Sequence, residues 1–215
     1  DLEARIKILN KVALDIQNNR DKFFYLLANE AGKTLKDCDA EVRESIDFIN
    51  YYCHQAKELF TKEELEGPTG EKNYLLHAPK GKFLCISPWN FPMAIFIGQI
   101  SAALITGNSV IAKPAEDTSI IAYEIIKLFH EAGVPGSTLQ LIIGGREIGN
   151  ELTKNDQLNG VAFTGSSEAA KKININLANS NGPIKTLIAE TGGQNVMFVD
   201  SSSLKEQVID DVVRS

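Results

Sequence analysis

The sequence predicts an α/β protein in which a parallel sheet carries helices on both faces and follows an N-terminal helical segment. In the first 60 residues, apolar side chains recur at helical spacing. After residue 73, short apolar runs alternate with helical patterns. These runs are almost continuously apolar, which is typical of parallel strands that are covered on both faces.

The N-terminal segment is expected to hold three helices. Residues 2–18 repeat apolar side chains at helical spacing, and from residue 41 to Phe60 a largely apolar stripe continues along one helix. Gly32 separates the second helix from the third. The stretch GPTGEKN, 67–73, is rich in turn formers and predicts a loop.

Strands and helices are expected to alternate after that loop. The predicted strands are YLLHA (74–78), KFLCISP (82–88), SVIAKP (109–114), TLQLIIGG (138–145), GVAFTGS (160–166), TLIAETGG (186–193) and NVMFVD (195–200). Five helices are predicted between and after these strands. The first covers 93–105, the second runs from a cap at Asp117 or Thr118 to Gly133, and a short third helix follows TLQLIIGG. The fourth begins at Ser166, and the fifth covers 203–214.

Composition excludes several classes of function. The chain has 215 residues and a net charge of −6, which gives no support for binding to nucleic acid or to anionic membranes. No apolar run approaches the roughly 20 residues of a membrane helix. The start, DLEARIKILNK, is charged from its first residue, so we expect no signal peptide. It also lacks Met, so we expect either a piece of a longer protein or a chain whose start is disordered. Three cysteines without a CxxC pair favour the cytoplasm over a disulfide framework or zinc site.

Ligands of parallel sheets bind beyond the carboxyl ends of the strands, so the residues there are the candidates. In FTGSSEAA, Gly165 and Ser166 lead into a helix N-terminus, which favours a phosphate. A plain serine N-cap is the alternative. In IAKPAE, Lys113 and Glu116 suit a ribose, and Glu116 would repel a 2′-phosphate; a solvated ion pair is the alternative.

Three further strand ends carry candidates. In SPWNFP, two prolines stiffen the loop around Asn90, whose amide suits an oxyanion; an ordinary turn asparagine is the alternative. In IIGGRE, Gly145 forms a turn that is compatible with the edge of a cofactor. In LIAETGGQN, Glu190 ends an apolar strand just before two glycines, where carboxylates often take part in catalysis.

The histidines and cysteines are not candidates. His54, His77 and His130 share no ligand spacing. We read Cys38, Cys53 and Cys85 as structural, because a reactive thiol needs an exposed, electropositive setting.

The order of these motifs resembles one family. PWNFP, AKPAE, AGVPG, FTGSSE and AETGGQN follow one another as in the aldehyde dehydrogenase superfamily, and EAGKTLKDCDAEV is similar to its N-terminal segment. The stretches CISPWNFP, AKPAEDT, ETGGQN and VDSSSLKEQVIDDVV most resemble the glutamate-semialdehyde (pyrroline-5-carboxylate) dehydrogenase branch, in particular the dehydrogenase half of bifunctional proline utilisation A proteins. A Rossmann-like fold follows from this resemblance.

The resemblance implies a role for each candidate. Asn90 would stabilise the oxyanion, and Glu190 would act as the general base that activates water. Lys113 and Glu116 would hold the adenosine ribose of NAD, and Ser166 would contact the pyrophosphate. The residues that would border the cofactor are Ile86, Pro88 and Trp89.

The implied activity is the NAD-dependent oxidation of L-glutamate γ-semialdehyde to L-glutamate in a longer protein. The family's nucleophilic cysteine lies beyond the general base, and no cysteine lies between Glu190 and Ser215, so we expect the chain alone to be inactive. A dehydrogenase for another aldehyde and a non-catalytic nucleotide-binding module are the alternatives. FAD is expected only in a separate proline dehydrogenase domain outside this chain.

The implied domains are an N-terminal helical segment (1–66) that packs on the cofactor domain, a NAD-binding domain (67–189) and the start of a catalytic domain (190–215). Residues 73–80 lie where the family builds an oligomerisation hairpin, which implies a homo-oligomer. Within this chain the run YLLHA can lie unpaired, and an unpaired edge invites association.

Overall fold

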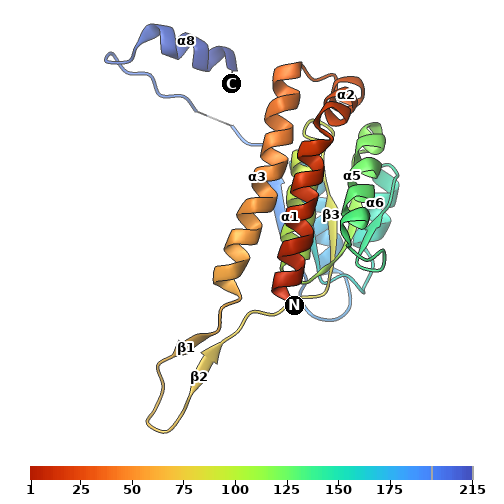
Figure 1. Ribbon diagram of the computed structural model, residues 1–215, viewed down its shortest axis with the longest axis vertical. Coiled ribbons are helices and arrows are strands. Elements are labelled where there is room, and N and C mark those ends of the chain that lie inside the picture. Colours follow the sequence, from red (N-terminus) through yellow and green to blue (C-terminus); the bar gives the residue numbers. More distant parts are fainter. Residues whose placement is uncertain (195, 215) are drawn as a thin grey trace.

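The computed structural model describes residues 1–194 and 196–214 and contains a helical layer, a sheet and a protruding hairpin (Figure 1). Its helices are α1 (Leu2–Asn18), α2 (Arg20–Glu30), α3 (Leu35–Leu59), α4 (Ala94–Ile105), η1 (Glu116–Thr118), α5 (Ser119–Ala132), α6 (Arg146–Thr153), α7 (Ser167–Ala178) and α8 (Lys205–Arg214). Its strands are β1 (Glu63–Leu65), β2 (Asn73–Leu75), β3 (Lys82–Ile86), β4 (Ser109–Lys113), β5 (Leu139–Leu141), β6 (Gly160–Gly165) and β7 (Thr186–Thr191).

The main sheet has five strands in the order β5-β4-β3-β6-β7, and every neighbouring pair is parallel. The predicted parallel sheet is therefore confirmed. Because parallel strands present their carboxyl ends at one edge, the segments after β3, β4, β5, β6 and β7 all emerge there. That edge carries every candidate residue from the sequence.

Side chains of each strand alternate between two cores, one on each face of the sheet. In β3, Phe83 and Cys85 belong to the larger core, which includes α4 and α5. Leu84 is buried in the smaller core, which includes residues of α7, and Ile86 packs against it. The predicted cover of helices on both faces is confirmed.

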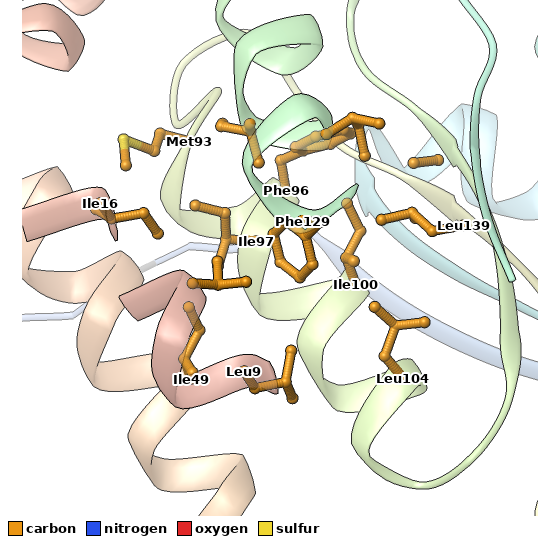
Figure 2. Packing of buried hydrophobic residues seen from close by; sticks show 14 of the residues in the cluster. Leu9, Ile16, Ile49, Met93, Phe96, Ile97, Ile100, Leu104, Phe129 and Leu139 are labelled. Carbon is orange, nitrogen blue, oxygen red and sulfur yellow. The ribbon is translucent and has the colours of Figure 1, made fainter. Parts of the chain in front are cut away.

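The N-terminal helices form an additional layer over α4 and α5. Helix α1 contacts α3, α4 and α5, and α3 contacts α4. Figure 2 shows Ile16 of α1, Ile97 of α4 and Phe129 of α5 within one cluster, and all three are fully buried. Burial of each such side chain contributes about 1.5–3 kcal/mol. The helical segment therefore belongs to the same core as the sheet.

Three parts of the structure differ from the predictions. Only Asn73–Leu75 of the YLLHA region forms a strand, and β2 pairs with the unpredicted β1, so the expectation of an unpaired strand was wrong. The run NVMFVD was expected to be a strand, but Val196–Asp200 form none, and Asn195 lies outside the described residues. Helix α3 starts at Leu35, earlier than the apolar stripe predicted.

Candidate functional site

A cavity lies between the carboxyl edge of the sheet and helices α6 and α7, and we call it the cofactor cleft. It has a volume of about 170 Å³. It is lined by Ile86, Lys113, Arg146, Gly149, Asn150, Thr153, Phe163, Ser166, Glu168, Ala169, Lys172, Ile173 and Asn176. Pockets for whole small-molecule ligands usually occupy about 300–1,000 Å³, so this cleft has room for only part of a larger ligand.

Lys113 ends β4 and reaches into this cleft. Its residue is only 6% exposed, and its Nζ donates one hydrogen bond, to the carbonyl oxygen of Pro114 at 3.2 Å. Burial lowers the pKa of Lys113, while the nearby carboxylate of Glu116 acts to raise it. An ammonium group with spare donors in a half-enclosed cleft is suited to hydroxyl or phosphate oxygens.

Glu116 begins η1 and lies against the turn that precedes α6. A Cβ atom at position 145 would lie 2.6 Å from Glu116 Oε2, closer than side-chain carbons approach. Gly145 therefore allows the carboxylate to rest directly on the backbone beside the cofactor cleft. The structure brings together Lys113, Glu116 and Gly145, which come from two different strand ends.

Ser166 caps α7, and its Oγ accepts a hydrogen bond from the backbone N–H of Ala169 at 3.2 Å. The capping interpretation of Ser166 is therefore observed, and the residue also lines the cleft. A Cβ at Gly165 would lie 2.7 Å from the ring of Phe163, so glycine is required there by packing within the chain. The phosphate contact remains a prediction.

The cleft also contains polar residues that the sequence did not single out. Arg146 and Asn150 lie on α6, and Lys172 and Asn176 lie on α7. Asn176 Nδ2 donates to Asn150 Oδ1 at 3.0 Å and to Thr153 Oγ1 at 2.8 Å, which ties the two helices together. Their signal in the sequence is polar side chains four residues apart on helices that follow strands, a pattern shared by most solvent-exposed helices.

The segment between β3 and α4, residues 87–93, carries Asn90, and we call it the Asn90 loop. Its backbone begins with a hydrogen bond from Ser87 N to the carbonyl oxygen of Lys113 at 3.2 Å. Pro88 is half-buried, whereas Trp89 and Asn90 are exposed. The loop therefore presents its amide and its indole to solvent at the carboxyl edge of the sheet.

Glu190 lies on the other face of the sheet from the cofactor cleft. In the register of β6 and β7, Glu190 is the partner of Thr164. Both residues line an open, mostly apolar groove of about 600 Å³ between α3, α4 and the sheet, which we call the Glu190 groove. The structure thus separates the predicted base, in the Glu190 groove, from Lys113 and Ser166, which line the cofactor cleft on the other face of the sheet.

Gln99 of α4 connects the two sides. Its Nε2 donates to the carbonyl oxygen of Ile86 at 3.2 Å and to Thr164 Oγ1 at 3.1 Å. Ile86 lines the cofactor cleft, whereas Thr164 and Gln99 line the Glu190 groove. The Gln99 side chain therefore links the carboxyl ends of β3 and β6 by two hydrogen bonds.

The three cysteines are buried in the cores of the protein. Cys38, Cys53 and Cys85 are free and buried, as their structural assignment predicted. Burial raises the pKa of the Cys85 thiol to about 12. Within residues 1–194 and 196–214, neither the cofactor cleft nor the Glu190 groove is lined by a cysteine. None of the helices described here has both the length and the apolar character needed to cross a membrane.

Comparison with known proteins gives the same family as the sequence motifs. The family model described as the aldehyde dehydrogenase family matches residues 1–215. The bifunctional protein PutA of Escherichia coli (strain K12) is 46% identical over 215 residues, which cover 98% of this chain and 15% of that protein. The 1-pyrroline-5-carboxylate dehydrogenase of Anoxybacillus flavithermus is 38% identical over 217 residues, which cover 99% of this chain and 42% of that protein.

Solved structures agree as well. A structure of proline utilization A (PutA) with proline bound in remote sites matches all of this chain and 22% of its own, with a TM-score of 0.97 and 50% identity. A 3,6-anhydro-L-galactose dehydrogenase in complex with NAP covers 89% of this chain and 40% of its own, with a TM-score of 0.82 and 32% identity. The chain therefore spans less than half of each of these relatives. Its sequence and its fold show that the chain belongs to the aldehyde dehydrogenase family, as a homologue of the PutA and 1-pyrroline-5-carboxylate dehydrogenases.

Proposed function

We propose that the full-length protein containing this chain oxidises L-glutamate γ-semialdehyde to L-glutamate with NAD. The observation that carries the proposal is that Lys113 and Ser166 line one cleft and that Glu116 lies near Lys113, against Gly145. Asn90 lies at the same edge of the sheet. The substrate is taken from the 1-pyrroline-5-carboxylate dehydrogenases and PutA proteins that the chain resembles.

The residues around the cofactor cleft fit the adenosine end of NAD. The carboxylate of Glu116 is suited to accept hydrogen bonds from the two ribose hydroxyls, and the ammonium of Lys113 is suited to donate to them. A 2′-phosphate would bring negative charge onto Glu116, which favours NAD over NADP. The N-terminus of α7, at Ser166, faces the cleft and favours the pyrophosphate. NAD, when bound, supplies the hydride acceptor.

The other chemical groups act on the aldehyde. A cysteine thiolate, supplied by the chain beyond Glu190 in this family, attacks the aldehyde carbon. The amide of Asn90 donates a hydrogen bond to the oxygen, which gains negative charge in that attack. After hydride loss, Glu190 removes a proton from the water that hydrolyses the thioester, and it does so from the face opposite the cofactor cleft.

The same proposal includes the division of the chain into residues 1–66, 67–189 and 190–215. The hairpin of β1 and β2 spans the first boundary, and its exposed Leu65, Tyr74 and Leu75 support a role in a homo-oligomer. The 215-residue chain alone would bind the cofactor without turning over the aldehyde.

The test is NADH formation by the full-length protein. With NAD, we expect turnover of glutamate semialdehyde to exceed that of succinate semialdehyde and of simple aliphatic aldehydes, and Glu190→Gln to slow hydrolysis about 10²–10⁴-fold. A clear preference for another aldehyde would show that the proposed substrate is wrong. An absence of aldehyde-dependent NADH formation, together with NAD binding, would make the protein a nucleotide-binding module.

A further inference from the structure

The N-terminal helices hold the Asn90 loop through one buried carboxylate. Glu41 of α3 is 1% exposed, and its Oε1 accepts hydrogen bonds from Met93 N at 2.8 Å and Ala94 N at 3.2 Å. These two N–H groups lie where the Asn90 loop ends and α4 begins. Glu41 is 52 residues earlier in the chain than Met93, so the contact exists only in the folded protein.

Helix α4 depends on this contact because it lacks a cap of its own. Its N-cap residue is Met93, whose side chain makes no capping hydrogen bond, and its first turn contains no acidic residue. The first N–H groups of a helix need acceptors, and negative charge near them is favourable. Glu41 supplies both from a different helix.

A second contact holds the loop at its exposed side. Lys33 Nζ lies 2.7 Å from Glu41 Oε2 and 4.1 Å from the centre of the Phe91 ring. Glu41 Oε2 has no aligned hydrogen-bond donor among the described residues, so the ionic contact with Lys33 is its compensation. One lysine thereby joins the buried carboxylate to the residue that follows Asn90.

From these contacts we infer that the Lys33–Glu41 pair positions the amide of Asn90 for its role in the oxidation of the aldehyde. The inference rests on the proposed function of Asn90. The loop is held at Ser87 by β4, at Phe91 by Lys33 and at Met93 by Glu41, and Asn90 lies between these points. Lys33 and Glu41 are positioning residues that act through Asn90, since their contacts are with the loop and the start of α4.

The experiment is a double-mutant cycle on kcat in the full-length enzyme, at saturating NAD and with an aldehyde that it oxidises. Asn90→Ala removes the oxyanion donor and is expected to lower kcat about 10²–10³-fold. Glu41→Gln keeps an acceptor for the N–H groups but loses the charge, and a small shift of Asn90 is expected to lower kcat about 10-fold. In the Asn90→Ala background, Glu41→Gln is expected to lower kcat less than about twofold, because the group it positions is gone.

A matched control exists in the same fold. Glu30 of α2 accepts hydrogen bonds from Ile120 N at 2.9 Å and Ile121 N at 2.6 Å, and so caps α5 as Glu41 caps α4. Glu30→Gln is expected to leave kcat unchanged at saturating NAD. Hydrogen–deuterium exchange should accelerate over residues 93–97 in Glu41→Gln and over residues 120–123 in Glu30→Gln.

The possible results distinguish the positioning role of Glu41, the oxyanion contact of Asn90 and the proposed substrate. Equal slowing by Glu41→Gln with and without Asn90, or no slowing at all, would overturn the positioning role. An Asn90→Ala enzyme with full kcat would overturn both that role and the proposed oxyanion contact. Failure of glutamate semialdehyde as a substrate would overturn only the proposed function, because the cycle can be run on any aldehyde that is turned over. If Glu41→Gln does not fold, Phe91→Leu, at a 40% exposed residue, is expected to show the same dependence on Asn90.

Discussion

Replacement of Lys33 by methionine tests the energetics of the buried ion pair. The side chain of Glu41 is 0% exposed and that of Lys33 is 12% exposed, at a separation of 2.7 Å. Removal of one partner of a buried pair costs about 3–5 kcal/mol, because the remaining charge is left without compensation. Since Glu41 keeps the hydrogen bonds from Met93 and Ala94, we expect the lower end of this range.

The contact of Lys33 with Phe91 adds to this loss. A cation 4.1 Å from the centre of an aromatic ring contributes about 0.5–1 kcal/mol at exposed sites. The total loss in the free energy of unfolding is therefore about 3–4 kcal/mol. At a urea dependence of about 2 kcal/mol per molar, the midpoint falls by about 1.5–2 M.

The assay is urea unfolding of the 215-residue chain, followed by far-ultraviolet circular dichroism. Lys127→Met is the control, because Lys127 pairs with Glu131 at 3.8 Å with both side chains about half exposed. Such a pair contributes about 0.3–0.5 kcal/mol. Adding Glu41→Gln to Lys33→Met should recover part of the loss by removing the uncompensated charge. Equal, small effects of Lys33→Met and Lys127→Met would refute the reasoning.

Three further predictions concern the cofactor cleft and the thiols. Gly145→Ala is expected to weaken NAD binding by the full-length protein about tenfold, because its Cβ would displace Glu116. Gly136→Ala, with open space around it, is expected to have no effect, and equal affinities of the two variants would contradict the proposed ribose contact. The three buried cysteines are expected to resist iodoacetamide in the native chain at pH 8 and to react in urea, because burial hides the thiols and raises the pKa of Cys85 to about 12. Rapid labelling of the native chain would contradict their burial. The 215-residue chain is expected to bind NAD only weakly, and micromolar or tighter binding by isothermal titration calorimetry would contradict this.

The sequence predicted most of the secondary structure because its periodicities are local. The helix over 2–18, the five strands of the sheet and the end of α5 at Gly133 all follow from patterns within about ten residues. Predictions of strands failed where the outcome depended on whether a second strand was available for pairing. Strand β1 (Glu63–Leu65) has no apolar run of its own and exists because β2 pairs with it. The segment Val196–Asp200 has strand-like composition but pairs with no strand among residues 1–194 and 196–214.

The start of α3 was predicted too late for a different reason. The apolar stripe begins at residue 41, but Thr34 caps the helix by accepting a hydrogen bond from Asp37 N at 3.3 Å. The first turn is polar and therefore does not contribute to the stripe. A capping signal, and not hydrophobic periodicity, marks this boundary.

By itself, the sequence determined the class of fold and the family, because these depend on short motifs and their order. It also singled out the strand ends as candidates for the functional site. Tertiary structure alone decided that Glu190 lies across the sheet from the cofactor cleft, that Gly145 supports Glu116, and that Glu41 and Lys33 reach the Asn90 loop. The physical reason is that each of these relations joins segments distant in the chain. Such contacts form only once the strands are in register and the helices have packed, and no local pattern specifies them.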